Sequence, residues 1–171
     1  MNLNGGHGAE WWQWLISGLE IIGGITLCLI PGGQSLGVAL IATGAGSLIN
    51  GFITEYNVGT FNGGWWGGQV AGLVSLVPYL GSVLGAFAGS VTTDFIDLGC
   101  SNIDWEKAAW SGVVAYGLTF FPTAVGQIAD YWHISNPYVH LSNAYNSIVA
   151  GTASSITNVF WRGKNARFST V

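Results

Sequence analysis

The sequence predicts an all-α fold: a bundle of about six to seven short, Gly-rich apolar helices, several of membrane-spanning length. Three observations lead to this prediction. Only 7% of the 171 residues are charged, whereas ordinary soluble domains carry about 25%. Half of the residues are hydrophobic, and the mean hydropathy is +0.46. The two longest uncharged stretches, 21–54 and 56–93, are divided by glycine and proline at intervals that fit helices and turns.

The first three helices are expected in the N-terminal half of the chain. The first covers about 10–30 and ends at Pro31-Gly32-Gly33. The second covers about 35–54 and is followed by the turn-rich loop EYNVGTFNGG, and the third covers about 64–77. A strand is the competing interpretation of 70–76, but the recurrence of small residues at every fourth position favours a helix.

Proline and aspartate mark the next boundaries. Pro78 is expected to kink or break the third helix before a fourth helix that ends near Leu98; the alternative is that 64–98 forms one long bent span or a re-entrant pair. Asp104 stands where an N-cap or first-turn acid would begin a fifth helix, which is expected to end near Phe121. Pro122 is expected to start a sixth helix that ends near His133.

The last predicted helix, at about 138–160, separates its residues onto two faces. The apolar face carries Leu141, Tyr145, Ile148 and Ile156. The other face is polar without charge and carries Asn143, Ser147, Ser154 and Asn158. One interpretation is a helix between lipid or protein and a wet lumen, and the other is an ordinary amphipathic surface helix.

Glycine recurs at every fourth position in two runs. The runs are Gly64, Gly68 and Gly72, and then Gly81, Gly85 and Gly89. Small residues at this spacing flatten one face of a helix, so that a neighbouring backbone can approach closely, as in membrane helix pairs. We therefore interpret the six glycines as a helix-packing seam. The alternative is the same close contact inside a soluble bundle.

Aromatic and basic residues lie near the ends of predicted segments. The aromatics expected at a membrane interface are Trp11, Trp12, Trp14, Trp65 and Trp66. The basic tail consists of Arg162, Lys164 and Arg167, which suit an anionic membrane surface or a solubilising terminus. The expected organisation is a linker at 1–9, a single helical membrane-active domain at 10–161 and the basic tail at 162–171.

The polar residues give little indication of catalysis. Asp94 and Asp97 have no evident basic partner and are expected to be solvated at a helix end. Asp130, His133 and His140 can be imagined as metal ligands, but a structural or interfacial role is favoured. Cys28 and Cys100 are expected to be buried free thiols, with a disulfide left open. No cofactor, enzymatic activity or nucleic-acid partner is therefore expected, since no fingerprint motif or basic stripe is present.

Residues 47–108 carry a resemblance to a known family. The segments SLINGFITE, FNGGW, GAFAGSVTTD and IDWEKAAW resemble the C-terminal toxin region of Rhs-repeat polymorphic toxins of Gram-positive bacteria. The resemblance implies an effector that is delivered to a competitor, together with a cognate immunity protein and a parent Rhs cage or chaperone. Glycine-zipper members of this wider class permeabilise the target membrane.

Three hypotheses for function follow. The first is a pore-forming or membrane-depolarising toxin domain, acting at the cytoplasmic membrane of the target cell through insertion and glycine-zipper assembly, including assembly as a homo-oligomer. The second is a non-enzymatic pretoxin or translocation module of a polymorphic toxin. The third is a soluble helical interaction domain. Leakage of liposomes caused by the chain distinguishes the first hypothesis from the others.

Overall fold

The structure is helical throughout the residues that it describes. It is a computed structural model that describes residues 8–77, 80–131 and 142–168. The helices are α1 (Trp11–Cys28), α2 (Gln34–Val58), α3 (Asn62–Val74), α4 (Gly81–Leu98), the short 3₁₀ helix η1 (Cys100–Asn102), α5 (Trp105–Tyr131) and α7 (Ser142–Phe168). The all-α prediction is confirmed, and the strand considered for residues 70–76 is absent because α3 continues to Val74.

Several predicted boundaries agree with the structure. α3 ends at Val74 and α4 begins at Gly81, so residues 64–98 form two separate helices rather than one bent span. Asp104 caps α5, since its Oδ1 accepts a hydrogen bond of 2.9 Å from the backbone N–H of Lys107. The end of α2 differs, because the helix continues to Val58 past the predicted end near residue 54; Gly59 ends it with a φ of +80°, a left-handed conformation that a residue with a Cβ rarely adopts.

Two predicted boundaries are wrong. Pro122 does not begin a sixth helix, because α5 runs without interruption from Trp105 to Tyr131. Proline has a helical φ, so it removes one hydrogen bond of a helix without always ending it. The last helix extends to Phe168 rather than stopping near Phe160, so the three basic residues of the predicted tail belong to α7.

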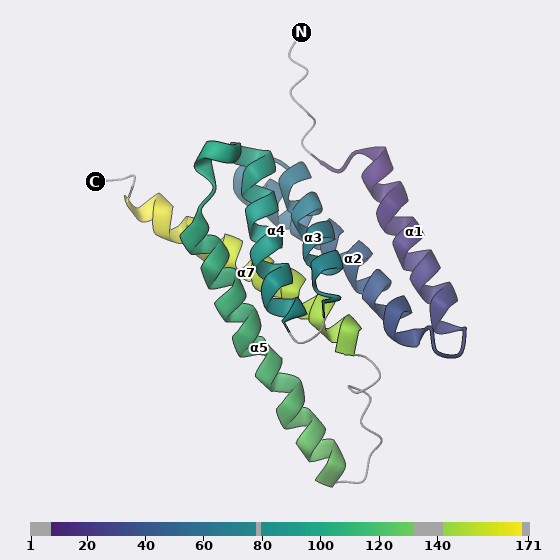
Figure 1. The fold of residues 1–171 in the computed structure, drawn as a ribbon. Coiled ribbons are helices and arrows are strands. Elements are labelled where there is room, and N and C mark those ends of the chain that lie inside the picture. Colours follow the sequence, from purple (N-terminus) through teal and green to yellow (C-terminus); the bar gives the residue numbers. More distant parts are fainter. Residues whose placement is uncertain (1–7, 78–79, 132–141, 169–171) are drawn as a thin grey trace.

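The first four helices run alternately up and down, and α7 passes across them (Figure 1). α3 lies between α2 and α4, while α1 packs against the outer side of α2. α7 contacts α2, α3, α4 and α5. α5 extends beyond the rest of the bundle (Figure 1).

Glycine permits the close approach of α3 to both of its neighbours. A methyl group placed on Gly68 would lie 2.6 Å from Cα of Ser47 in α2. One placed on Gly85 of α4 would lie 2.5 Å from the carbonyl oxygen of Ala71 in α3. Real Cβ atoms do not come so near to a backbone, so these helices could not pack as they do with larger residues at the two positions.

All six glycines of the predicted seam lie at such contacts. Gly64, Gly68 and Gly72 face α2, whereas Gly81, Gly85 and Gly89 face α3. The contacts are made within a single chain. The seam therefore packs neighbouring helices of one chain against each other, which is common to the membrane and the soluble interpretation of these glycines.

Candidate functional site

The bundle places polar and small residues inside and large apolar residues outside. Among the described side chains, 18 polar or charged residues are buried, compared with ten hydrophobic ones, of which seven are alanine. In the same part of the chain, 28 large hydrophobic residues are exposed. Water-soluble proteins bury most of their leucine, isoleucine and valine and keep polar groups outside. This bundle has the opposite arrangement.

α1 shows the inversion along one helix. Its buried residues are Gln13, Ser17 and Gly24. Its exposed residues include Trp11, Leu15, Leu19, Ile22, Ile25 and, just past its end, Leu29. An ordinary surface helix turns its apolar stripe toward the core. Here the stripe points away from the bundle, and the polar residues contact α2 and α3.

α7 has the same arrangement as α1, with its polar face toward the bundle and its apolar face outward. Ser154 and Asn158 of the polar face are buried, while Ile148 and Ile156 of the apolar face point outward. The described residues of this segment thus have the orientation opposite to that of an ordinary amphipathic surface helix, whose apolar face meets the core. Leu141 lies outside the described residues, as do the side chains of Asn143, Tyr145 and Ser147.

Hydrogen bonds between side chains join the helices through this polar interior. Asn50 of α2 is fully buried. Its Nδ2 donates to the carbonyl oxygen of Gly64 at 2.7 Å, and its Oδ1 accepts from Oγ of Ser155 at 2.8 Å. One amide therefore links α2, α3 and α7. Polar groups that find partners in this way are the usual connection between helices in a membrane interior.

Three further hydrogen bonds attach α1 to α3. Gln13 Nε2 donates to Asn62 Oδ1 at 3.0 Å, and Gln69 Nε2 donates to Glu20 Oε2 at 2.8 Å. Between them, the indole Nε1 of Trp65 donates to Oγ of Ser17 at 3.0 Å. The inward residues of α1 thus meet a complementary row on α3, at successive turns of both helices.

Replacing Asn50 by leucine tests this interior directly. We expect a loss of about 1–3 kcal/mol in the free energy of unfolding, because the carbonyl of Gly64 and the hydroxyl of Ser155 would lose their partner. Ile49→Asn, at the adjacent exposed position, is the matched control. It should change stability in detergent by less than about 0.5 kcal/mol. Equal effects of the two variants would show that Asn50 is solvated.

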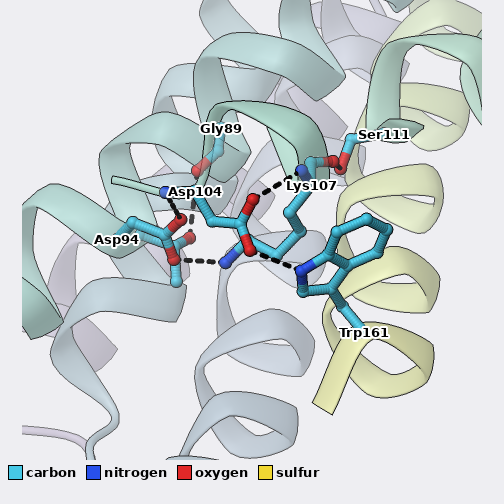
Figure 2. A network of polar contacts seen from close by, with 7 residues as sticks. Gly89, Asp94, Asp104, Lys107, Ser111 and Trp161 are labelled. Carbon is cyan, nitrogen blue, oxygen red and sulfur yellow. Dashed lines mark hydrogen bonds and ion pairs between the residues drawn. The ribbon is translucent and has the colours of Figure 1, made fainter. Parts of the chain in front are cut away.

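A charged network closes the end of the bundle where α4, α5 and α7 meet (Figure 2). Asp94 of α4 is 3% exposed and forms an ion pair with Nζ of Lys107 in α5. The second oxygen of Asp94 accepts the backbone N–H of Asp104 at 3.1 Å. Asp104 in turn accepts the indole N–H of Trp161 from α7. Two carboxylates and one ammonium group leave one net negative charge in the network.

Asp94 corrects a sequence-based expectation. It was expected to be solvated and without a basic partner, whereas it is buried against Lys107. The short connection through η1 turns the chain back, so that the first turn of α5 lies beside the last turn of α4. Asp97 is half-buried, and its carboxylate accepts a hydrogen bond of 3.2 Å from the N–H of Gly63.

Buried polar groups without a hydrogen-bond partner in the described part of the chain also occur on α4 and α7, two of the helices that carry this network. They are Ser90 Oγ, Ser154 Oγ and Asn158 Nδ2. Ser90 precedes Asp94 by one turn of α4, and Ser111, which is also buried, follows Lys107 by one turn of α5. We call Ser90, Asp94, Lys107, Ser111, Ser154 and Asn158 the polar seam. It ends at the apolar cluster of Ala71, Ala86, Ala115, Val149, Ala150 and Ala153.

Four of the five tryptophans expected at a membrane interface have exposed or half-exposed rings. Trp11, Trp14 and Trp66 are exposed, and Trp12 is partly exposed. Trp65 is the exception, because it is 1% exposed and its ring lies edge-on to those of Trp12 and Trp66. The glycines around it on α3 let its side chain reach Ser17 of α1, so this ring belongs to the interior and not to an interface.

The basic residues, the possible metal ligands and the two cysteines lie at separate places in the chain. Arg162, Lys164 and Arg167 lie in the last turns of α7, but their side chains are outside the described set. His133 and His140 also lie outside it, as does the side chain of Asp130. The described residues contain no group of three His, Cys, Asp or Glu side chains that could hold a metal ion. Both cysteines are free, and Cys100 is exposed rather than buried.

Between α2 and α7 the outer surface forms an apolar groove of about 410 Å³. Ala42, Gly46 and Gly151 line it together with larger residues such as Ile49 and Phe160. The pair Ala42 and Gly46 repeats the small-residue spacing on α2, here toward open space. The groove is therefore continuous with the apolar exterior.

One helix of the described chain has the length and composition to cross a membrane, namely the part of α2 from Leu36 to Asn57. Several helices of this kind were predicted, and the prediction is confirmed for one of them. Comparison with protein-family models, with curated proteins and with solved structures gives no match. The function is therefore inferred from the residues of this chain.

Proposed function

We propose that this chain is a helical domain that inserts into a lipid bilayer and makes it permeable to ions. The observation that supports the proposal most strongly is the inverted distribution of polarity, with small and polar side chains inside and large apolar ones outside. Hydrocarbon gives exposed leucine and isoleucine a favourable environment, whereas close helix contacts there depend on small residues and internal hydrogen bonds. The inward rows of α1, α3 and α7 provide both.

Several helices beyond α2 would lie in the bilayer under this proposal. α1 has 18 residues and would be about 27 Å long at 1.5 Å per residue. That is close to the hydrocarbon thickness of about 30 Å. Its charged residue, Glu20, is hydrogen-bonded to Gln69 within the bundle. Ionisable groups in membrane helices typically face the interior of a bundle in this way.

The polar seam is the proposed route for ions. Ionisable residues inside membrane bundles mark ion pathways, and rings of acidic residues favour cations. Asp94 and Lys107 occupy one end of the seam, and three buried polar groups without partners follow it. Buried groups of this kind are the sites where internal water is held. The small alanines beyond the seam would be the point at which the route opens or closes.

The sequence resemblance extends the proposal to a biological setting. A relative of Rhs toxin regions would act at the cytoplasmic membrane of a competing bacterium, and a cognate immunity protein would protect the producer. Assembly into a homo-oligomer would involve outward surfaces such as the groove between α2 and α7, since the contacts of the glycine seam are made within one chain.

Depolarisation of liposomes tests the proposed activity. Vesicles with a potassium gradient and a potential-sensitive dye should lose their potential when the purified chain is added. Replacing Ile22, which is 63% exposed on α1, by lysine should reduce the effect by about a hundredfold. A lysine in the centre of a membrane helix costs about 2.5–3.5 kcal/mol.

The matched control is Tyr56→Lys, which adds the same charge at the end of α2, where the side chain is 91% exposed. It should leave depolarisation unchanged within a factor of two or so, because a lysine near a helix end reaches the aqueous interface. If native protein bound to the vesicles leaves their potential intact, the proposed function is wrong. Equal activity of Ile22→Lys and native protein would show that α1 does not enter hydrocarbon.

A further inference from the structure

The charged residues of the first four helices and the start of α5 gather at one end of the bundle. They are Glu10, Glu55, Asp94, Asp97, Asp104, Glu106 and Lys107, with Glu20 as the exception on α1. Hydrogen bonds and ion pairs show that these segments are neighbours there. Gln13 contacts Asn62 at the starts of α1 and α3, and Gly63 contacts Asp97 at the end of α4. We call this the charged end.

The opposite end, which we call the uncharged end, is formed by the α1–α2 turn at 29–33 and, between α3 and α4, by residues 75–77 and Leu80. The sequence has no charged residue in either turn, nor anywhere in 21–54 or 56–93. Leu29 is 81% exposed, and Ile30, Val77 and Leu80 are exposed as well. Among the described residues, these two turns thus offer water only apolar and uncharged groups.

The two turns reach different depths. The contact positions of Gly68 with Ser47 and of Gly72 with Thr43 show that α3 runs antiparallel to α2 and ends beside its middle. The α1–α2 hairpin therefore extends past the α3–α4 turn, as Figure 1 also shows. Measured from the charged end, α1 would be about 27 Å long and α3 about 20 Å at 1.5 Å per residue. The length of α1 is close to a hydrocarbon core of about 30 Å, whereas α3 is about 10 Å shorter than this core.

From this distribution we infer the orientation of the bundle in the bilayer, an inference that rests on the proposed function. The uncharged end enters first, the α1–α2 turn reaches the far interface, and the charged end stays at the surface from which the chain arrived. Burying the seven ionisable residues of the charged end in hydrocarbon would be costly, whereas the uncharged end matches the apolar acyl chains. The partner that covers the uncharged end is therefore the hydrocarbon of the lipid bilayer.

α5 is compatible with the same orientation. Asp130 follows Lys107 by 23 residues in one continuous helix, which corresponds to about 35 Å. This distance exceeds the thickness of the hydrocarbon core of about 30 Å. With Lys107 at the entry surface, position 130 would therefore lie beyond the core at the opposite interface.

The two native cysteines are placed to test the orientation. Cys28 ends α1 beside the deep turn, and Cys100 lies in η1 at the charged end; both thiols are free. Full-length Cys28→Ser and Cys100→Ser variants each keep one thiol. Each would be bound to preformed liposomes and treated from outside with a membrane-impermeant maleimide, and its labelling rate divided by the rate of the same variant in detergent.

We expect Cys100 to react from outside at nearly its rate in detergent, and Cys28 to react at least tenfold more slowly. Permeabilising the vesicles with detergent should restore the reaction of Cys28. Depolarisation measured on the same vesicles separates the two proposals. If vesicles depolarise while Cys28 reacts as fast as in detergent, or while Cys100 is protected, the orientation is wrong and the proposed function stands. If vesicles do not depolarise, both are wrong.

A pair of charge variants gives an independent measurement. Ile30→Lys puts a lysine into the deep turn, and Leu98→Lys puts one at the charged end; both side chains are exposed in the native protein. Ile30→Lys should slow depolarisation at least tenfold, and Leu98→Lys should leave it within twofold of native. Equal rates for the two variants would contradict an ordered entry of the uncharged end.

Discussion

Replacing Asp94 by alanine is expected to lower the free energy of unfolding by about 3–5 kcal/mol, the loss found when one partner of a buried ion pair is removed. The side chain of Lys107 is 11% exposed, so its ammonium group would stay largely buried without a counter-charge. The backbone N–H of Asp104 would lose its acceptor as well. Both consequences affect the contact between α4 and α5.

Chemical unfolding in detergent, followed by helical circular dichroism, would measure this loss. Glu55→Gln removes an acid from the charged end without touching the pair, and should change stability by less than about 0.5 kcal/mol. The double variant Asp94→Leu with Lys107→Met should recover most of the loss, because no buried charge is left unpaired. A loss below about 1 kcal/mol for Asp94→Ala would indicate a solvated pair of the kind found on surfaces.

Replacing Gly85 by leucine is expected to destabilise the bundle by about 3 kcal/mol or more, since overpacking that moves backbones lies at the upper end of such effects. The first carbon of the new side chain would lie 2.5 Å from the carbonyl oxygen of Ala71 and 3.0 Å from Cβ of Ala150. α3, α4 and α7 meet at this point, so all three would have to separate.

Gly117→Leu is the matched control for Gly85→Leu. Gly117 lies within α5 with open space around it. A leucine there should be neutral or should stabilise the helix by up to about 1 kcal/mol, because glycine is the poorer helix former. If Gly85→Leu keeps native stability but loses self-association, Gly85 acts in contacts between chains and not in the fold of one chain.

The helices themselves could be predicted from the sequence to a large extent. Uncharged apolar stretches, glycine-proline turns and the N-cap at Asp104 indicated most of the boundaries. Pro122 was misread because proline at a first helical position and proline inside a helix have the same local signature. The structure has Pro122 inside a helix, because α5 continues through it from Trp105 to Tyr131.

The candidate site was less accessible to sequence reasoning. The spacing of Ser154 and Asn158 on α7 was visible, but not the direction in which they point. Asp94 and Lys107 are 13 residues apart, and their pairing depends on the turn through η1. The row of Gln13, Ser17 and Glu20 on α1 is a signal that the sequence contains, since spacings of four and three residues place the three side chains on one face of a helix.

Composition and periodicity are local properties of the chain, so the helical fold, the near absence of charge and the glycines at close-packing intervals could be predicted from the sequence. The positions of the charges along the chain, and hence the lack of charge at 29–33 and 75–80, are also given by the sequence. The inward direction of the polar faces of α1 and α7 became known from the tertiary structure. An amphipathic pattern has the same period whether its apolar side meets a core or a bilayer, so the distinction depends on which residues the neighbouring helices cover.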